Sequence, residues 1–368
     1  MSNFYKLPIK NIRSETNDAI SVTFAVPADL KEKFQYKQGQ YLTLKSDING
    51  EEVRRAYSMC SSPVEEDLTV TVKRVQGGKM SNYIPNQLKE GDTMEVMPPD
   101  GRFYTEIDGD NVKTYYMFGA GSGITPLYSI IKTILEEEPM SKIYLFYGNR
   151  NEDSIIFKNG LDSLEKKYAG QLFVTHILSQ PKLEKPSGVF SIFKTGKPTW
   201  KGKIGRIDAI NAAKFLEENP PRTTQVEYFI CGPSGMIDAV EQSLLNRQIK
   251  DKKIHTERFT TSKSATAVGK ALAADQANAT AVVTLDKKEI TVEVPAGKTI
   301  LDALIEAKAD PPYSCTSGAC STCMAKVTSG TTKMEVCYAL DDDEVEEGYI
   351  LTCQAHATSG KVELTFDV

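Results

Sequence analysis

The stretch PPYSCTSGACSTCMA, residues 311–325, places three cysteines within nine positions near the end of a chain of 368 residues. Cys315, Cys320 and Cys323 follow the spacing C-x4-C-x2-C, and the residues between them are small. Small residues such as Gly318 let backbone N–H groups approach the sulfurs, which bulky side chains would prevent. The stretch therefore predicts a loop wrapped around a metal centre.

Cysteine usage in the rest of the chain also points to metal or redox chemistry. The chain has seven cysteines, an odd number, and most of them follow residue 314. The first residues, MSNFYKLPIKNIRSETND, contain no continuous apolar segment of the kind that directs export. Since disulfide frameworks belong mainly to exported proteins, we expect these cysteines to serve a metal or redox function.

The spacing matches the plant-type [2Fe-2S] ferredoxins, which use C-x4-C-x2-C and one distant cysteine. Cys353, in YILTCQA, is the expected fourth ligand; Cys337 is its rival and is interpreted as a buried thiol. A zinc site is the alternative, but zinc ribbons usually pair two C-x2-C knuckles and only one short pair occurs here. From residue 281 onward the chain resembles a complete plant-type ferredoxin domain, which implies an α+β fold of the β-grasp type.

Charge and hydropathy exclude two classes of partner. Lys and Arg total 44 against 49 Asp and Glu, so the net charge is −5 and there is no basic footprint for nucleic acid. No apolar run approaches the roughly 18 residues that a membrane span needs. We therefore expect a soluble, cytoplasmic protein of two or three domains, because the chain is too long for one ordinary core.

Changes of pattern divide the chain into three domains and a linker. Residues 1–107 contain short alternating runs such as QYLTLKS and DLTVTVKRV, which are typical of an antiparallel β-barrel. Residues 108–259 alternate strands, glycine turns and helices, which indicates an α/β domain with a parallel sheet. Residues 260–280, rich in Ala, Ser and Thr, indicate a linker, and residues 281–368 form the ferredoxin domain.

A glycine-rich turn stands in the second domain. GAGSGITP, residues 119–126, places Gly119, Gly121 and Gly123 between a strand and a helix, where backbone N–H groups can meet a pyrophosphate. The third glycine of the G-x-G-x-x-G fingerprint would fall at Ile124, so a purely structural turn is the alternative.

Four further stretches carry a resemblance to a known family. RAYS (55–58), GGKMSNYI (77–84), CGPSGM (231–236) and HTERF (255–259) occur in the order and spacing of the ferredoxin-NADP reductase superfamily. The chain resembles the class that fuses a flavin barrel, a pyridine-nucleotide domain and a plant-type ferredoxin. The resemblance covers nearly the full length and implies FAD, a [2Fe-2S] cluster and NADPH or NADH. Some reductases with this domain order use FMN instead of FAD.

The resemblance implies flavin-binding roles in the barrel. Arg55 would pair with the flavin diphosphate, Tyr57 would lie against the isoalloxazine ring, and the Ser58 hydroxyl would sit near its N5. A helix start at Lys79 would face the phosphates. The implied flavin contacts are Arg55, Ala56, Tyr57, Ser58, Val72, Lys73, Lys79, Met80 and Ser81.

The resemblance also implies roles in the second domain. Cys231 would lie where the hydride leaves the nicotinamide, and Glu257 with Phe259 would close the site behind the flavin. Ser58, Cys231 and Glu257 are thus the expected catalytic residues. Arg150 and Arg206 could meet a 2′-phosphate, which favours NADPH, or could be solvated. The implied nucleotide contacts are Gly119, Gly121, Gly123, Thr125, Pro126, Arg150, Arg206, Gly232, Pro233 and Met236.

The expected function is electron transfer. NAD(P)H would reduce the flavin, and electrons would pass singly to a cluster held by Cys315, Cys320, Cys323 and Cys353 and then to a partner. The implied partner is the oxygenase of a multicomponent system, in particular a di-iron enzyme that acts on an aromatic acyl-CoA. The alternatives are a reductase for a Rieske oxygenase or a lipid desaturase, and a flavin and iron–sulfur redox sensor.

An acidic run precedes the fourth expected ligand. Six of the seven residues from 341 to 347 are Asp or Glu. A solvated loop is one interpretation of this run. The other is electrostatic steering of a redox partner that has a basic face.

Overall fold

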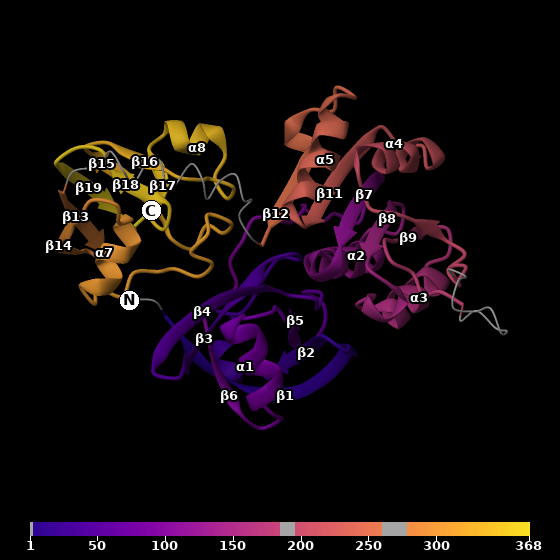
Figure 1. Cartoon of the computed structure of the whole chain (residues 1–368), viewed down its shortest axis with the longest axis horizontal. Coiled ribbons are helices and arrows are strands. Elements are labelled where there is room, and N and C mark those ends of the chain that lie inside the picture. The colour runs from indigo at the N-terminus through magenta and orange to yellow at the C-terminus, as the bar shows by residue number, and fades with distance from the viewer. Residues whose placement is uncertain (1–2, 185–195, 260–277) are drawn as a thin grey trace.

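The computed structural model describes residues 3–184, 196–259 and 278–368. Its strands form three main sheets, which Figure 1 shows as an indigo-to-purple barrel, a magenta-to-salmon layer flanked by helices, and an orange-to-yellow unit. Most of the linker expected at 260–280 lies outside the described residues. Within the described ranges, none of the helices combines the length and the apolar character that crossing a membrane requires.

The first sheet is an antiparallel barrel. It is built from β1 (Tyr5–Thr16), β2 (Ala19–Phe24), β3 (Tyr41–Ile48), β4 (Glu51–Ser58), β5 (Leu68–Lys73) and β6 (Thr93–Val96), with the helices η1 (Ala28–Leu30) and α1 (Lys79–Gln87). The strand order is β4-β3-β6-β1-β2-β5, and a bridge between Met59 and Val70 brings the two edges together. Leu7, Leu42 and Val72 are among the buried side chains that fill its interior.

The second sheet is parallel throughout. Its strands are β7 (Lys113–Ala120), β8 (Lys142–Asn149), β9 (Leu172–Leu178), β10 (Lys203–Ile204), β11 (Gln225–Gly232) and β12 (Ile254–Arg258), in the order β10-β9-β8-β7-β11-β12. The chain progresses from β7 toward one edge and from β11 toward the other. In such sheets a ligand binds beyond the carboxyl ends of the strands at this switch point, here between β7 and β11.

Helices cover both faces of the parallel sheet. They are α2 (Ile124–Glu137), α3 (Lys158–Lys167), α4 (Ala209–Glu218) and α5 (Ser234–Leu245), with the short turns η2 (Gly121–Gly123), η3 (Glu152–Ser154) and η5 (Asp251–Lys253). Leu127 of α2 packs in one apolar layer with Tyr115, while Phe215 of α4 packs in the other with Tyr116. Adjacent strand residues face opposite sides, so β7 fills both layers.

The third sheet is mixed and belongs to the ferredoxin-like unit. The elements of this unit are β13 (Ala279–Leu285), β14 (Lys288–Val294), α7 (Ile300–Glu306), β15 (Met324–Ser329), β16 (Thr332–Met334), α8 (Asp342–Glu346), β17 (Tyr349–Leu351), β18 (Ala355–Ala357) and β19 (Lys361–Thr365). The strand order of the sheet is β14-β13-β19-β15-β17, and β16 and β18 pair with each other separately. Every second residue of β13 is buried, as expected for a strand with one face on the core. Thr299 caps α7 and accepts a hydrogen bond from the backbone of Asp302.

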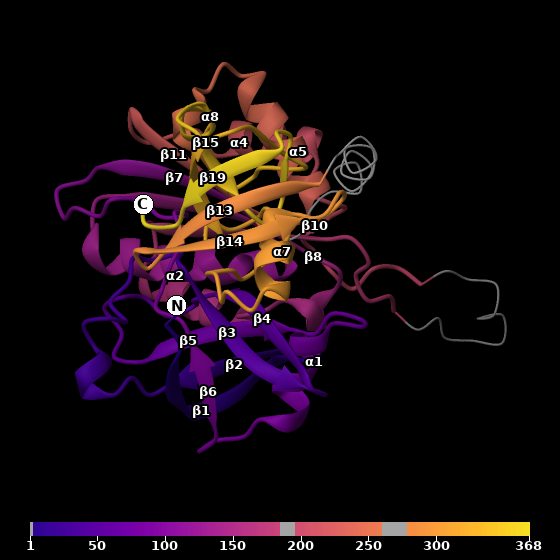
Figure 2. The same cartoon turned by 90° about the vertical axis from the view of Figure 1, so that its left-hand side faces the viewer.

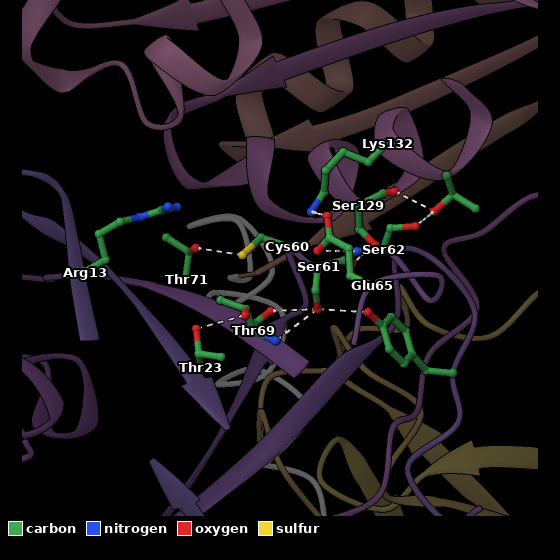
Figure 3. Close-up of polar contacts among 12 residues, drawn as sticks. Arg13, Thr23, Cys60, Ser61, Ser62, Glu65, Thr69, Thr71, Ser129 and Lys132 are labelled. Atoms are coloured by element: carbon green, nitrogen blue, oxygen red, sulfur yellow. Dashed lines mark hydrogen bonds and ion pairs between the residues drawn. The ribbon is translucent and has the colours of Figure 1, made fainter. Parts of the chain in front are cut away.

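A polar seam joins the barrel to α2 of the parallel domain. Figure 3 shows Ser61, Ser62 and Glu65 of the barrel facing Ser129 and Lys132 of the helix. Ser129 Oγ donates to the carbonyl of Ser61 at 2.5 Å, and Lys132 forms an ion pair with Glu65. Buried hydrogen bonds of this kind fix the orientation of the two domains because an unpaired polar group would be unfavourable there.

The ferredoxin-like unit contacts both other domains. Figures 1 and 2 show it beside the barrel strands β3 and β4. Arg54 of β4 forms an ion pair with Asp310 at 2.8 Å. The guanidinium of Arg258, at the end of β12, lies 4.9 Å from the centroid of the Tyr338 ring. The cysteine-rich loop therefore stands between the barrel and its own sheet.

Candidate functional site

Three of the predicted residues meet where β4, β11 and β12 end. Ser58 Oγ donates to Glu257 Oε2 at 3.2 Å, and Cys231 Sγ lies 3.9 Å from the same oxygen. Cys231 and Glu257 are neighbours in register on the parallel strands β11 and β12. The expected catalytic residues are thus close together, although the barrel supplies one and the parallel domain supplies two.

Burial controls the protonation of this group. It raises the pKa of Glu257 to about 8, and hydrogen bonds with Ser58 and Cys231 act in the opposite direction. The carboxyl is therefore mostly protonated at neutral pH and can exchange a proton near pH 8. Burial also raises the pKa of Cys231 well above its usual range, so the thiol stays neutral. At neutral pH the carboxyl of Glu257 therefore holds a proton, and the thiol of Cys231 carries no charge.

The glycine-rich turn lets α2 begin directly beside this group. Gly121 has a φ of +56°, in the left-handed region that favours glycine. A Cβ on Gly123 would lie 2.1 Å from the carbonyl oxygen of Cys231, so a larger residue would push the helix away. Thr125 and Pro126 are buried in the first turn of α2. The N-terminus of α2 therefore points to the switch point, where a pyrophosphate is favoured.

A cavity of about 1050 Å³ opens beside this turn. Six predicted nucleotide or flavin contacts line it, namely Lys73, Gly121, Arg150, Arg206, Pro233 and Met236. Gly119 and Gly232 lie on the adjoining strands β7 and β11, where a Cβ would come within 3 Å of Leu127 and Met236, respectively. The volume suits a ligand of nucleotide size.

Asn149 and Ser179 also line this cavity and were missed by sequence reasoning. Asn149 is 8% exposed, and within the described ranges its side-chain amide has no hydrogen-bond partner. Buried amides normally have partners, so this one is suited to a polar group of a ligand. The sequence feature that could have indicated Asn149 is YGNRN, residues 147–151, in which polar residues end an apolar strand-like run.

Three residues predicted at the flavin lie near the end of β4. Arg55 is exposed, and its guanidinium donates to the carbonyl of Arg54 at 2.6 Å. Ala56 and Tyr57 are half-buried. An available guanidinium and an aromatic ring on one strand fit a flavin that carries a diphosphate, because the first can pair with phosphate and the second can pack on the ring.

The other predicted flavin contacts differ in orientation. Val72 and Met80 are buried in the barrel core, so their side chains fill the barrel and a cofactor could meet mainly their backbone. Lys79 opens α1 at the surface and pairs with Glu51. Ser81 is buried and accepts a hydrogen bond from the backbone of residue 75 at 3.2 Å. The N-terminus of α1 itself is compatible with a phosphate.

Phe259 follows the last residue of β12 and is 39% exposed. It was predicted to close the site behind the flavin, and it follows Glu257 by two positions. Its exposed ring has room to lie against a bound planar group.

The four predicted cluster ligands meet in the ferredoxin-like unit. Cys320, Cys323 and Cys353 are buried and Cys315 is half-buried. The contacts among these thiols lower the pKa of Cys315 and Cys323 and raise the pKa of Cys320 and Cys353, as expected for neighbouring sulfurs that compete for protons. The backbone N–H of Ser317 donates to Cys315 Sγ at 3.4 Å. Four adjacent thiols with an N–H group pointing at sulfur fit a [2Fe-2S] cluster.

The spacing of these cysteines distinguishes a cluster from a zinc site. A C-x4-C-x2-C run with one distant cysteine is the pattern of a plant-type [2Fe-2S] ferredoxin, whereas zinc ribbons usually pair two C-x2-C knuckles. Cys337 is half-buried among apolar residues, and its Sγ lies 4.0 Å from the carbonyl of Leu340.

Comparison with known proteins matches each block of this site. The oxidoreductase FAD-binding domain matches residues 6–104, the oxidoreductase NAD-binding domain 117–242 and the 2Fe-2S iron-sulfur cluster binding domain 283–358. One component of 1,2-phenylacetyl-CoA epoxidase from Escherichia coli K12 is 37% identical over 368 residues, which cover 100% of this chain and 99% of the relative. The chain belongs to this family of flavin and iron–sulfur reductases.

Other relatives of the reductase serve different oxygenases. The ferredoxin reductase component of 3-ketosteroid-9-alpha-monooxygenase from Rhodococcus rhodochrous is 35% identical, with 98% of this chain and 96% of the relative covered. The solved structure of phthalate dioxygenase reductase shares the fold, with a TM-score of 0.60, 23% identity, and coverage of 99% and 98% of the two chains. These findings confirm the predicted fold class, the oxidoreductase function and the set of FAD, [2Fe-2S] and pyridine-nucleotide cofactors.

Proposed function

We propose that the reductase carries electrons from NADPH through FAD and the [2Fe-2S] cluster to a di-iron phenylacetyl-CoA epoxidase, in cytoplasmic phenylacetate catabolism. The full-length similarity to the component of the Escherichia coli epoxidase supports this partner. The observation that carries the electron route is the contact between Ser58 and Glu257, because it joins the flavin strand to the nucleotide domain.

The proposal assigns one cofactor to each domain. Residues 1–107 bind FAD, residues 108–259 bind NADPH, and residues 281–368 hold the cluster through Cys315, Cys320, Cys323 and Cys353, with residues 260–280 as the connection. The positions of the three family models support this division. FAD, when bound, accepts a hydride from NADPH and releases electrons singly.

Residues of the barrel and of the nucleotide domain bind and orient the groups between which the hydride is transferred. Arg55 and the N-terminus of α1 bind the flavin phosphates, and Tyr57 packs against the ring. Ser58 and Cys231 position the two reacting rings, and Glu257 holds a proton beside Ser58. The 3.2 Å contact between Ser58 and Glu257 and the raised pKa of Glu257 support these roles.

Preference for NADPH rests on two guanidinium groups. Arg150 and Arg206 line the same cavity, where together they can bind a 2′-phosphate. Two carboxylates of the cavity are already engaged: Asp153 pairs with Lys182, and Asp208 caps α4. The unpartnered amide of Asn149 adds a polar contact for the nucleotide.

The partner is tested by coupling the purified reductase to the oxygenase component of phenylacetyl-CoA epoxidase. NADPH consumption that depends on the oxygenase and yields epoxidised phenylacetyl-CoA is the expected result. Rapid cytochrome c reduction without this product would instead assign the reductase to another oxygenase. Negligible NADPH oxidation with either acceptor would support the redox-sensor alternative.

A further inference from the structure

Tyr41 of β3 links the barrel to the cysteine loop. Its hydroxyl donates to Asp100 Oδ2 at 2.8 Å and lies 2.8 Å from Thr322 Oγ1. Thr322 stands between the proposed ligands Cys320 and Cys323, 281 positions from Tyr41 along the chain. Tyr41 is 5% exposed, so the contact is a buried polar junction between two domains.

The barrel holds Tyr41 in a fixed place. Its backbone N–H donates to the carbonyl of Asp100 at 2.9 Å, and Asp100 returns a bond to the carbonyl of Tyr41 at 3.1 Å. The Thr322 hydroxyl also lies 3.3 Å from the Asp100 carboxylate. Because hydrogen bonds to Asp100 hold both the backbone and the hydroxyl of Tyr41, the position of the phenol is set by the barrel. The position of the cysteine loop therefore depends on its contact with this phenol.

Tyr41 is also the cross-strand partner of Ser58. The two residues stand directly opposite each other in the antiparallel pair β3–β4. Opposite residues project from the same face of a sheet, about 5 Å apart at Cα. Ser58 contacts Glu257, whereas Tyr41 contacts Thr322. The strand pair β3–β4 therefore carries both Ser58, which is proposed to lie beside the flavin, and Tyr41, which contacts the cysteine loop.

Two further contacts between the barrel and the ferredoxin-like unit flank this junction. On one side the Arg54 guanidinium pairs with Asp310 at 2.8 Å and lies 4.3 Å from the centroid of the Tyr313 ring. On the other side Arg102, two positions after Asp100, forms an ion pair with Glu344 of α8. Along the chain, the Tyr41 contact lies between these two: Asp310 and Tyr313 precede the first cysteine of the loop, and Glu344 follows the third.

We propose that Tyr41 is a positioning residue for electron transfer from the flavin to the cluster, because it seats the loop at Thr322 on the strand pair that bears Ser58. This inference rests on the proposed function and adds a residue that it does not assign. In each transfer one electron leaves reduced FAD and one electron reduces the [2Fe-2S] cluster. Electron transfer slows steeply with distance, so a loosened loop lowers its rate.

The first test compares Tyr41→Phe and Thr322→Val with wild-type holoprotein. Each substitution removes one hydroxyl and leaves the size of the side chain nearly unchanged. Amide hydrogen exchange in residues 311–325 should rise by about fivefold, as for the loss of one ordinary hydrogen bond. In anaerobic single turnovers, flavin reduction by NADPH should keep its rate, and the following cluster reduction should slow by at least about twofold.

The matched control is Tyr5→Phe, whose hydroxyl accepts a hydrogen bond from Lys33 within the barrel. It should alter neither exchange in the loop nor cluster reduction. The EPR spectrum and the reduction potential of the cluster should be the same in all variants, since positioning leaves the cluster itself intact. Unchanged cluster reduction in Tyr41→Phe, or equal slowing in Tyr5→Phe, overturns the proposal.

A charge exchange provides a second test that does not touch Tyr41. Arg102→Glu should slow cluster reduction, and Arg102→Glu combined with Glu344→Arg should recover it at low salt. If the double variant does not recover the rate of cluster reduction, the position of the loop does not depend on contacts at this side of the barrel, which counts against the proposal. The wild-type measurement separates the two proposals: a wild-type cluster that NADPH never reduces contradicts the proposed function, whereas normal wild-type reduction with indifferent variants contradicts only the role of Tyr41.

Discussion

The Ser58 hydroxyl donates to the Glu257 carboxylate at 3.2 Å across the boundary between the barrel and the nucleotide domain. The polar seam around Ser61 and Ser129 fixes the same boundary (Figure 3). The two halves of the proposed hydride-transfer site are therefore held in one orientation, while a third domain supplies the proposed cluster ligands.

Protonation of Glu257 should control flavin reduction. With its pKa raised to about 8, the carboxyl keeps its proton at pH 7 and loses it as the pH rises through 8. The rate of flavin reduction by NADPH should therefore fall above pH 8. Glu257→Gln should abolish this step in the pH profile and slow the reaction by about a hundredfold, within the range for lost acid–base assistance.

The control for this prediction is Glu218→Gln, which removes a surface ion pair with Lys203. It should keep the wild-type rate and the wild-type pH profile. A Glu257→Gln variant that retains the inflection near pH 8 would show that another group titrates.

Removal of one ligand should separate the two redox centres. Wild-type protein should contain two irons per chain, and Cys320→Ser should lose the cluster because a buried ligand is missing. Cytochrome c reduction should disappear, whereas NADPH-dependent ferricyanide reduction through the flavin should persist. Cys337→Ser should keep the visible spectrum and both activities; loss of its cluster would contradict the assignment of Cys353 as the fourth ligand.

The cavity arginines should determine nucleotide preference. Arg150→Gln and Arg206→Gln should each raise KM for NADPH by about tenfold, the effect of losing one charge-assisted hydrogen bond. KM for NADH should change little, because NADH has no 2′-phosphate. Steady-state kinetics with both nucleotides provide the measurement, and an equal rise for NADH would show that the arginines bind another part of the nucleotide.

The acidic run divides into two roles in the structure. Glu344 pairs with Arg102 of the barrel, while Asp342 and Asp343 are exposed. If the exposed carboxylates steer the oxygenase, Asp342→Lys/Asp343→Lys should slow partner-dependent turnover at low salt, and the difference should shrink as salt screens charges over about 10 Å at 0.1 M. Flavin reduction by NADPH in the absence of the partner is the internal control. Equal turnover at every salt concentration would leave this run as a solvated surface.

Contiguous motifs made much of the fold and site predictable. CTSGACSTC places three cysteines in one loop, so their spacing alone indicates the chemistry. GAGSGITP departs from the dinucleotide fingerprint, and its role, like that of Ser58 in RAYS, was predicted from the family resemblance. The sequence did not predict the contact of Tyr41 with Thr322, because it depends on how two domains pack. Nor did it show that the side chain of Val72 points into the barrel core, since a half-buried strand pattern fits either direction.

The central claim is that electrons pass from NADPH through the flavin to the cluster within one chain. Anaerobic mixing with NADPH, followed by visible absorbance and freeze-quench EPR, tests it most directly. The account predicts loss of flavin absorbance first and then, in the same molecules, bleaching of the cluster and the EPR signal of a reduced [2Fe-2S] centre. A flavin that is fully reduced while the cluster stays oxidised would contradict it.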